Sequence, residues 1–136
     1  MTQKDKDLLL KDLCARLPYN PMVEYKGETY NVLGIAHGRL VLCKPFMSYT
    51  LDENPLVKEV KPYLFPLSSM TEEQKKEYNR WKHDIPIYHY EYGDVVEEIE
   101  LFDSPESFEY LIENHFDYRG LIERGLAIDA TGKNIY

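Results

Sequence analysis

Apolar residues near the start of the chain recur at the spacing of an amphipathic helix. The apolar positions are Leu9, Leu10, Leu13, Cys14 and Leu17. Thr2, with Asp5 three residues later, resembles a capping box, and Pro18 cannot continue the run. The pattern therefore predicts a helix over residues 3–17. Its water-facing positions would include Lys4, Lys11 and Asp12.

Three β-rich runs follow, separated by two turn signals. The runs are Met22–Tyr25, Thr29–Ala36 and Arg39–Lys44. Lys26-Gly27 and His37-Gly38 lie between them, and glycine accepts the positive φ that tight hairpin turns require. Apolar residues occupy both alternating sets of the middle run, so both of its faces are partly covered. This pattern favours a small curled, barrel-like antiparallel sheet.

The middle of the chain combines loop signals with a second helix. Residues 46–55 are rich in turn formers and are predicted to be a loop, and a strand is expected over 56–60. Pro62 and Pro66 argue against regular structure across the next residues. Thr71, with Gln74 three residues later, forms a capping box at the start of a surface helix.

A second β region begins after this helix. Ile85–Tyr92 is rich in β-formers, Gly93-Asp94 is a turn signal, and Val95–Phe102 is expected to be the return strand of a hairpin. The spacing of Val95, Ile99 and Phe102 also fits a helical stripe. We prefer the strand for residues 95–102.

The last part of the chain predicts an amphipathic helix and a short ending. Ser104 followed by Pro105 is a strong helix start, because proline at the first position loses no hydrogen bond. Phe108, Leu111, Ile112 and His115 then fall at i, i+3, i+4 and i+7, the spacing of one helix face. A helical turn over 121–124 should stop at Gly125. Residues 126–128 then predict a last strand before a loose tail.

These elements predict one α+β domain over residues 1–136. A soft boundary is expected near 66–71, where prolines cluster. It divides a helix plus β-meander over 1–66 from a helix, hairpin and helix over 67–136. The length fits one domain, since domains usually span roughly 100–200 residues.

Composition favours a globular protein of the cytoplasm. Hydrophobic residues make up 43% of the chain, and the first residues, MTQKDKDLLLKDLC, resemble neither an export signal nor a membrane span. In that compartment Cys14 and Cys43 would stay reduced and act as small core residues.

Charge is distributed unevenly along the chain. Residues 1–82 carry 13 basic and 11 acidic side chains, and residues 83–136 carry 3 basic and 13 acidic ones, a balance of −10. No lysine or arginine occurs between Lys82 and Arg119. Direct nucleic-acid binding through this part is disfavoured, because it would repel phosphates.

Most of these carboxylates fall on outward positions of the predicted hairpin and helix, which disfavours a convergent catalytic pair. They define a candidate interaction surface for a protein with a basic face. Its members are Glu91, Asp94, Glu98, Glu100, Glu106, Glu109 and Glu113.

Catalytic and cofactor motifs are weak. The four histidines form no zinc-ligand spacing, no nucleophile motif surrounds a serine or cysteine, and no glycine-rich phosphate loop occurs. We therefore expect no metal and no cofactor. The most enzyme-like cluster is His115 with Asp117 or Glu113. The simpler interpretation is that His115 ends a helix, where it interacts with the helix dipole.

Three segments resemble a group of short bacterial proteins associated with phage-like and mobile genetic regions. The segments are DLCARLPY at 12–19, VKPYLFPLSSMTEEQ at 60–74 and NHFDYRGLIERGLAIDATG at 114–132. The group has no assigned activity, so the resemblance carries over no catalytic residue. It implies a shared scaffold with a variable segment that includes residues 85–110, a layout more typical of recognition than of chemistry.

The sequence therefore favours a non-enzymatic binding or accessory protein whose acidic segment meets a basic partner. One alternative is a small hydrolase-like enzyme that uses His115 with Asp117 or Glu113. A second is a nucleic-acid-mimicking protein, or one that binds nucleic acid through basic residues and stacking rings. The residues for that binding would be Lys44, Lys58, Lys61, Tyr63 and Phe65.

Overall fold

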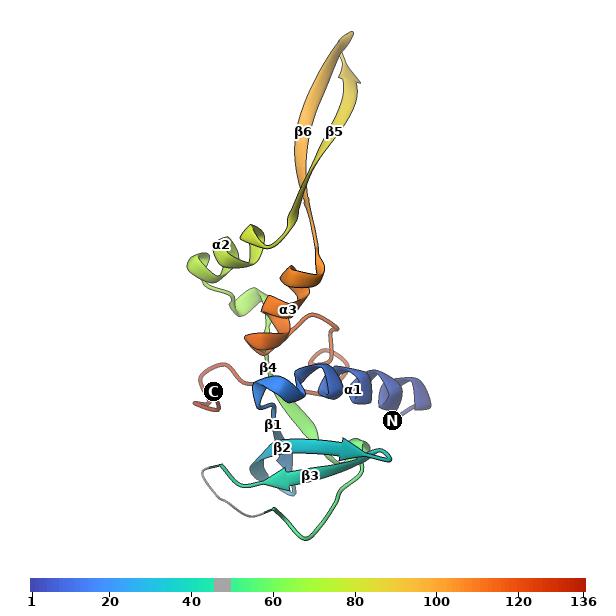
Figure 1. Ribbon diagram of the computed structural model, residues 1–136, viewed down its shortest axis with the longest axis vertical. Helices are drawn as coiled ribbons and strands as arrows, with labels where there is room; N and C mark the ends of the chain where they lie inside the picture. Colours follow the sequence, from blue (N-terminus) through green and yellow to red (C-terminus); the bar gives the residue numbers. More distant parts are fainter. Residues whose placement is uncertain (46–49) are drawn as a thin grey trace. The chain divides into compact units, whose positions relative to one another are not determined.

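The computed structural model describes residues 1–45 and 50–136, which form two compact units (Figure 1). Unit 1 comprises Met1–Ser69 and Ile112–Tyr136, and unit 2 comprises Met70–Leu111. The chain passes from unit 1 to unit 2 between Ser69 and Met70. The return of the last residues to unit 1 was not expected from the sequence. The fold class is α+β, as predicted.

The elements in chain order are α1 (Gln3–Arg16), η1 (Leu17–Tyr19), β1 (Met22–Tyr25), β2 (Glu28–Ala36), β3 (Arg39–Cys43), η2 (Val57–Glu59), β4 (Lys61–Pro66), η3 (Leu67–Ser69), α2 (Glu72–Arg80), β5 (His83–Glu91), β6 (Asp94–Phe102), α3 (Pro105–Glu113), β7 (Phe116–Asp117) and β8 (Ile128–Asp129). The first two predicted helices and the two predicted β regions are confirmed. Helix α3 begins at Pro105, as predicted, but it ends at Glu113, before His115. The predicted loop over 46–55 lies partly outside the described residues.

The sheet of unit 1 has the strand order β3-β2-β1-β4-β7, and β8 also pairs with β4. Lys26-Gly27 and His37-Gly38 form the two tight turns, and all four residues have positive φ, as type I′ turns require. Within the described residues, the outer strands β3 and β7 do not pair with each other. The sheet is therefore open, and the barrel-like closure expected from the sequence is not seen.

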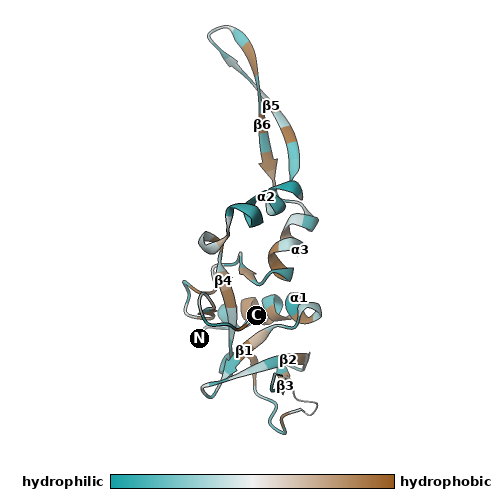
Figure 2. Cartoon of the chain, turned by 90° about the vertical axis from the view of Figure 1, so that its left-hand side faces the viewer, coloured by the Kyte–Doolittle hydropathy of each residue, from teal (hydrophilic) through white to brown (hydrophobic). Residues whose placement is uncertain are grey.

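Strand β4 corrects two predictions. The expected strand over 56–60 is wrong, because Val57–Glu59 forms a 3₁₀ turn, and the strand instead spans Lys61–Pro66 despite its prolines. Pro62 and Pro66 lie near its two ends, where a missing N–H removes little of the ladder. Between them the N–H of Phe65 donates to the carbonyl of His115 at 2.8 Å. Much of β4 is hydrophobic (Figure 2), as suits a central strand.

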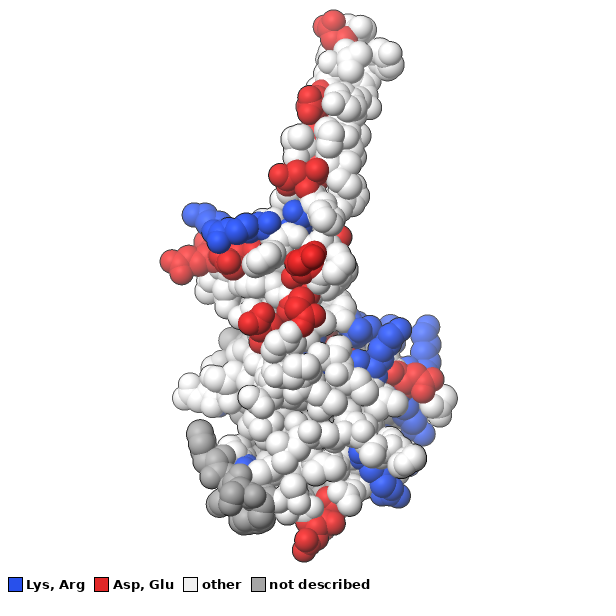
Figure 3. Space-filling model, in the orientation of Figure 1, with Lys and Arg blue, Asp and Glu red and all other residues white. Residues whose placement is uncertain are grey.

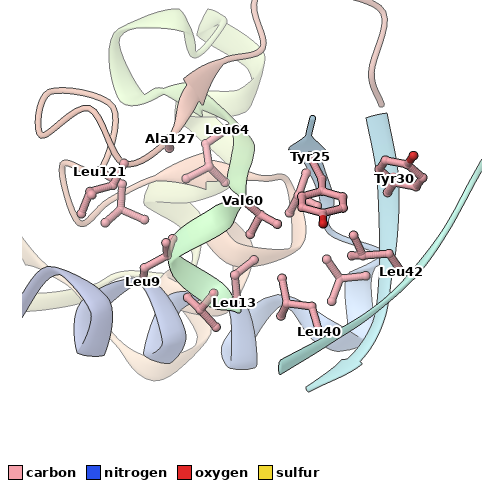
Figure 4. Close-up of a cluster of buried hydrophobic side chains, with 14 residues drawn as sticks. Leu9, Leu13, Tyr25, Tyr30, Leu40, Leu42, Val60, Leu64, Leu121 and Ala127 are labelled. Carbon is pink, nitrogen blue, oxygen red and sulfur yellow. The ribbon is translucent and has the colours of Figure 1, made fainter. Parts of the chain in front are cut away.

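One cluster of buried apolar side chains joins α1, the sheet and the last residues of unit 1 (Figure 4). Its labelled members are Leu9, Leu13, Tyr25, Tyr30, Leu40, Leu42, Val60, Leu64, Leu121 and Ala127. The leucines of α1 point toward Val60 and Leu64 around β4. Each fully buried leucine contributes roughly 1.5–3 kcal/mol relative to an exposed one.

The buried side of α1 follows the predicted period, but it is rotated around the helix. Thr2 and Asp5 form the expected capping box. The fully buried positions are then Leu9, Asp12, Leu13 and Arg16, whereas Cys14 is exposed. The expectations that Asp12 faces water and that Cys14 is a core residue are therefore wrong. Cys43 is buried, as expected.

Asp12 is buried because it pairs with two arginines. The Nε of Arg16 donates to its carboxylate at 2.8 Å, and the Nε of Arg119 donates at 3.2 Å. The Nη2 of Arg16 also donates to the carbonyl of Phe116 at 2.7 Å, across 100 residues of sequence. These contacts tie α1 to the last segment of unit 1. A buried charge is tolerated only when it is paired in this way.

We predict that Asp12→Ala lowers the free energy of unfolding by about 3–5 kcal/mol, because it leaves the buried Arg16 without its counter-ion. Urea denaturation followed by circular dichroism measures the change. Asp7→Ala on the exposed side of the same helix is the control and should shift stability by less than about 0.5 kcal/mol. Equal, small effects of the two substitutions would show that the Asp12 pair does not hold unit 1 together.

Candidate protein-binding hairpin

Strands β5 and β6 of unit 2 pair along their whole length as an antiparallel hairpin, from His83↔Phe102 to Glu91↔Asp94. The strand interpretation of residues 95–102 is therefore confirmed. The connecting turn is Tyr92-Gly93, where both residues have positive φ, at 50° and 84°. The prediction of a Gly93-Asp94 turn is wrong by one residue. A type I′ turn needs two central residues with positive φ, and pairing Glu91 with Asp94 leaves these two.

Hydrogen bonds at the base of the hairpin hold its two ends together. The hydroxyl of Ser104 donates to the carbonyl of Trp81, which links the chain after β6 to the chain before β5. The hydroxyl of Tyr78 on α2 donates to Asp103. Burial, together with this carboxylate, raises the pKa of Tyr78 well above its usual range, so the hydroxyl remains a donor. The base positions the hairpin relative to α2 and to the start of α3 within unit 2.

The register gives the hairpin two different faces, because residues paired across strands point to the same side. We call one the tyrosine face: Asp84, Pro86, Tyr88, Tyr90, Val95, Glu97, Ile99 and Leu101. We call the other the acidic face: His83, Ile85, Ile87, His89, Glu91, Asp94, Val96, Glu98, Glu100 and Phe102. Bands of hydrophobic and hydrophilic residues alternate along both strands (Figure 2).

The tyrosine face is uncovered. Tyr88, Tyr90 and Ile99 expose 62%, 82% and 59% of their surface, and Val95 and Leu101 are also exposed. A lone two-stranded sheet has no second layer that could bury either face. Contiguous exposed apolar residues mark interaction sites on soluble proteins, and tyrosine is enriched at such interfaces.

The hairpin carries strong negative charge that no lysine or arginine of its own offsets. It has six carboxylates and no lysine or arginine: Asp84, Glu91, Asp94, Glu97, Glu98 and Glu100. Carboxylates are spaced along the hairpin in the view of Figure 3. The Nε2 of His89 is 3.7 Å from Glu91 and 4.0 Å from Glu98. A cationic partner would relieve the repulsion among these groups.

The structure places all seven predicted interaction residues at exposed positions. It brings Glu91, Asp94, Glu98 and Glu100 together on the acidic face. The other three, Glu106, Glu109 and Glu113, lie on α3 instead. Sequence reasoning missed the tyrosine face. Its signal was the alternation of Tyr88 and Tyr90 in a strand with only one pairing partner.

His115 does not end a helix. It follows α3 with a φ of +63°, and its ring stacks on Tyr136 with 3.5 Å between ring centroids. Burial, with a smaller contribution from the charge of Arg16, lowers the pKa of His115 to about 4. Its Nδ1 is buried without a hydrogen-bond partner in the described chain. The expectation that a charged histidine interacts with the helix dipole is therefore wrong.

Neither predicted carboxylate orients His115. The carboxylate of Asp117 accepts hydrogen bonds from the main-chain N–H of Leu121 at 3.0 Å and of Ile122 at 2.9 Å. It thereby holds the turn that precedes β8, which the sequence predicted as a short helix over 121–124. Glu113 is exposed to solvent. The geometry therefore gives His115 a packing role.

The last residues are not the loose tail expected from the sequence. The hydroxyl of Tyr136 donates to the carbonyl of Tyr63 at 2.9 Å and accepts from the N–H of Met22 at 3.0 Å. Although 43% of the residue is exposed, the hydroxyl is enclosed between these two strands. Burial raises the pKa of Tyr136 to about 12.

The residues considered for nucleic-acid stacking do not form an exposed platform. Tyr63 is buried, and Phe65 packs with its ring centroid 6.2 Å from that of Phe116. Lys44 lies 3.1 Å from the carboxylate of Glu28. Lys58 and Lys61 are exposed, but the two aromatic rings do not accompany them at the surface.

Across residues 1–45 and 50–136, no group of three or more His, Cys, Asp or Glu side chains is arranged to hold a metal ion. In the same ranges, no helix combines the length and apolar character needed to cross a membrane.

Comparisons with known proteins give no match among protein-family models, curated proteins or solved structures.

The buried, neutral His115 predicts a loss of stability in mild acid. Its pKa is about 4 in the folded chain and near 6.5 when exposed, so the unfolded chain binds the proton more readily. Its contribution is complete above pH 6.5 and decreases as the pH falls toward 4. Urea denaturation across this window should show a steeper loss for the native chain than for His115→Asn, in which asparagine tolerates the positive φ. Parallel curves would contradict the prediction.

Proposed function

We propose that this protein is a non-enzymatic binding or accessory protein in which the hairpin of unit 2 binds a partner with a basic surface. The observation that carries the proposal is the exposed tyrosine face of a hairpin that has six carboxylates and no lysine or arginine. Unit 1 serves as the scaffold. Its core is complete without the hairpin, because its apolar cluster draws only on residues of unit 1.

The two faces would contribute differently to binding. Burying Tyr88, Tyr90 and Ile99 in an interface would supply affinity, since each large apolar side chain contributes roughly 1.5–3 kcal/mol when fully buried. The carboxylates would attract and orient a cationic partner, which mainly raises the association rate and the specificity. Strong binding would therefore require both faces.

The three segments that resemble phage-associated proteins support the division between unit 1 as the scaffold and the hairpin as the binding element. Residues 12–19 contact residues 114–132 through the pair of Asp12 with Arg16 and Arg119. Strand β4, in the segment 60–74, pairs with β7 and β8 from 114–132. The hairpin lies outside all three segments. A phage-associated role in the cytoplasm is part of the proposal.

Charge reversal tests the electrostatic part. We predict that joint substitution of Glu98, Glu100, Glu106 and Glu109 by lysine abolishes capture of the partner from a host lysate, measured by quantitative mass spectrometry. The control reverses four exposed carboxylates elsewhere: Asp7, Asp52, Glu73 and Glu123. The control should retain capture, because it produces the same net charge but leaves the hairpin unchanged. Equal capture by both variants and the native chain would refute the role of the candidate interaction surface.

Truncating the tyrosine face tests the apolar part. Tyr88→Ser combined with Tyr90→Ser should weaken binding of the captured partner by at least about tenfold, because the variant loses two aromatic contacts. Tyr92→Ser is the matched control, since Tyr92 is 99% exposed at the turn and lies outside the tyrosine face. Titration calorimetry with the purified partner measures both. Equal affinities of the double variant and the control would exclude this face.

A further inference from the structure

The hairpin register determines which main-chain N–H and C=O groups of each strand are not used within the hairpin and can hydrogen-bond to another strand. Glu91 and Asp94 flank the two-residue turn, so they exchange both of their hydrogen bonds. Hydrogen-bonded and non-hydrogen-bonded pairs then alternate along an antiparallel ladder. The main-chain groups of residues 95, 97, 99 and 101 therefore point away from β5. Those of residues 84, 86, 88 and 90 point away from β6.

The two outer edges of the hairpin differ in their donors. Pro86 lies on the outer edge of β5 and has no N–H, so that row of donors is interrupted. Strand β6 contains no proline. Its outer edge presents the N–H groups of Val95, Glu97, Ile99 and Leu101, and none of them hydrogen-bonds to another described segment. An uninterrupted edge of this kind can accept another strand.

We propose that the outer edge of β6 binds an extended segment of another protein as a third strand, and that this segment alternates basic and apolar residues. This inference rests on the proposed function and specifies the form of the partner. Main-chain hydrogen bonds to the β6 edge would supply affinity, and alternate side chains would supply specificity. Basic side chains would lie beside Glu98 and Glu100, and apolar ones beside Ile99 and Leu101.

Charge complementarity selects a basic segment over a second copy of this chain. Pairing β6 with β6 of another copy would bring Glu97, Glu98 and Glu100 beside the same residues, with no lysine or arginine on either hairpin. Like charges on adjacent strands are destabilising, and charged residues on edge strands prevent such pairing. The same carboxylates would favour a strand that carries lysine or arginine.

A proline at residue 97 tests the edge directly. Glu97→Pro removes the charge and the outward N–H, whereas Glu97→Ala removes the charge alone. Tyr88→Pro and Tyr88→Ala form the matching pair on the outer edge of β5, because Tyr88 lies opposite Glu97. An NMR contact between the Hα atoms of Tyr90 and Val95, a non-hydrogen-bonded pair, reports that the hairpin is intact in each variant.

The probe is a fluorescein-labelled synthetic peptide of about nine residues that alternates lysine and valine, titrated with the full chain by fluorescence anisotropy. We expect the native chain to bind it with a Kd on the order of micromolar at low salt. Glu97→Pro should bind at least about tenfold more weakly than Glu97→Ala. Tyr88→Pro should match Tyr88→Ala within about twofold.

Each other outcome refutes a specific claim. Equal affinities of Glu97→Pro and Glu97→Ala for the peptide would exclude strand addition. This conclusion would hold even if capture of the partner depends on the candidate interaction surface and the tyrosine face. No binding of the peptide by the native chain would also overturn the inference. A dimer in light scattering that Glu97→Pro dissociates would identify a second copy as the occupant and refute a basic segment. Failure of the proposed function is recognised separately: neither the charge reversal nor the Tyr88→Ser, Tyr90→Ser variant would then change capture of the partner.

Discussion

The pairing of Asp12 with Arg16 and Arg119 organises unit 1, because it joins α1 to residues more than a hundred positions later in the chain. The guanidinium of Arg16 also reaches the carbonyl of Phe116 at the start of β7, the strand that pairs with β4. The packing of α1, of β4 and of the last segment of unit 1 therefore depends on the fully buried carboxylate of Asp12. Residues 70–111 are therefore an insertion whose two ends both connect to unit 1.

The hairpin of unit 2 follows different physical rules from the sheet of unit 1. In unit 1 the apolar side chains of α1 cover residues around β4, so the strands there can be hydrophobic without contacting water. In unit 2 the same alternation of apolar and polar residues leaves both faces of two strands exposed. A sequence with this pattern is stable in water only if its base is anchored or its faces are covered. Two hydrogen bonds provide the anchor: Tyr78 of α2 donates to Asp103, and Ser104 donates to the carbonyl of Trp81.

Local sequence signals predicted the elements well. The capping pairs at Thr2 and Thr71, the glycine turns after Lys26 and His37 and the proline after Ser104 correspond to observed starts and turns. Errors arose where a distant residue decides the outcome. Asp12 could not be predicted as buried, because its partner Arg119 lies 107 residues away. Tyr136 is likewise fixed by Met22 and Tyr63. The acidic residues of the candidate site were recognised from composition, whereas the tyrosine face required the register.

The separation in sequence between contacting residues also sets the order in which the two units can form. The nine residue pairs of the hairpin all lie between His83 and Phe102, so the chain needs only local closure to make them. The sheet of unit 1 instead needs pairing between residues far apart in the chain, because β4 pairs with both β7 and β8. The hairpin can thus close through local contacts alone, whereas the sheet of unit 1 is complete only when the last residues of the chain have joined β4.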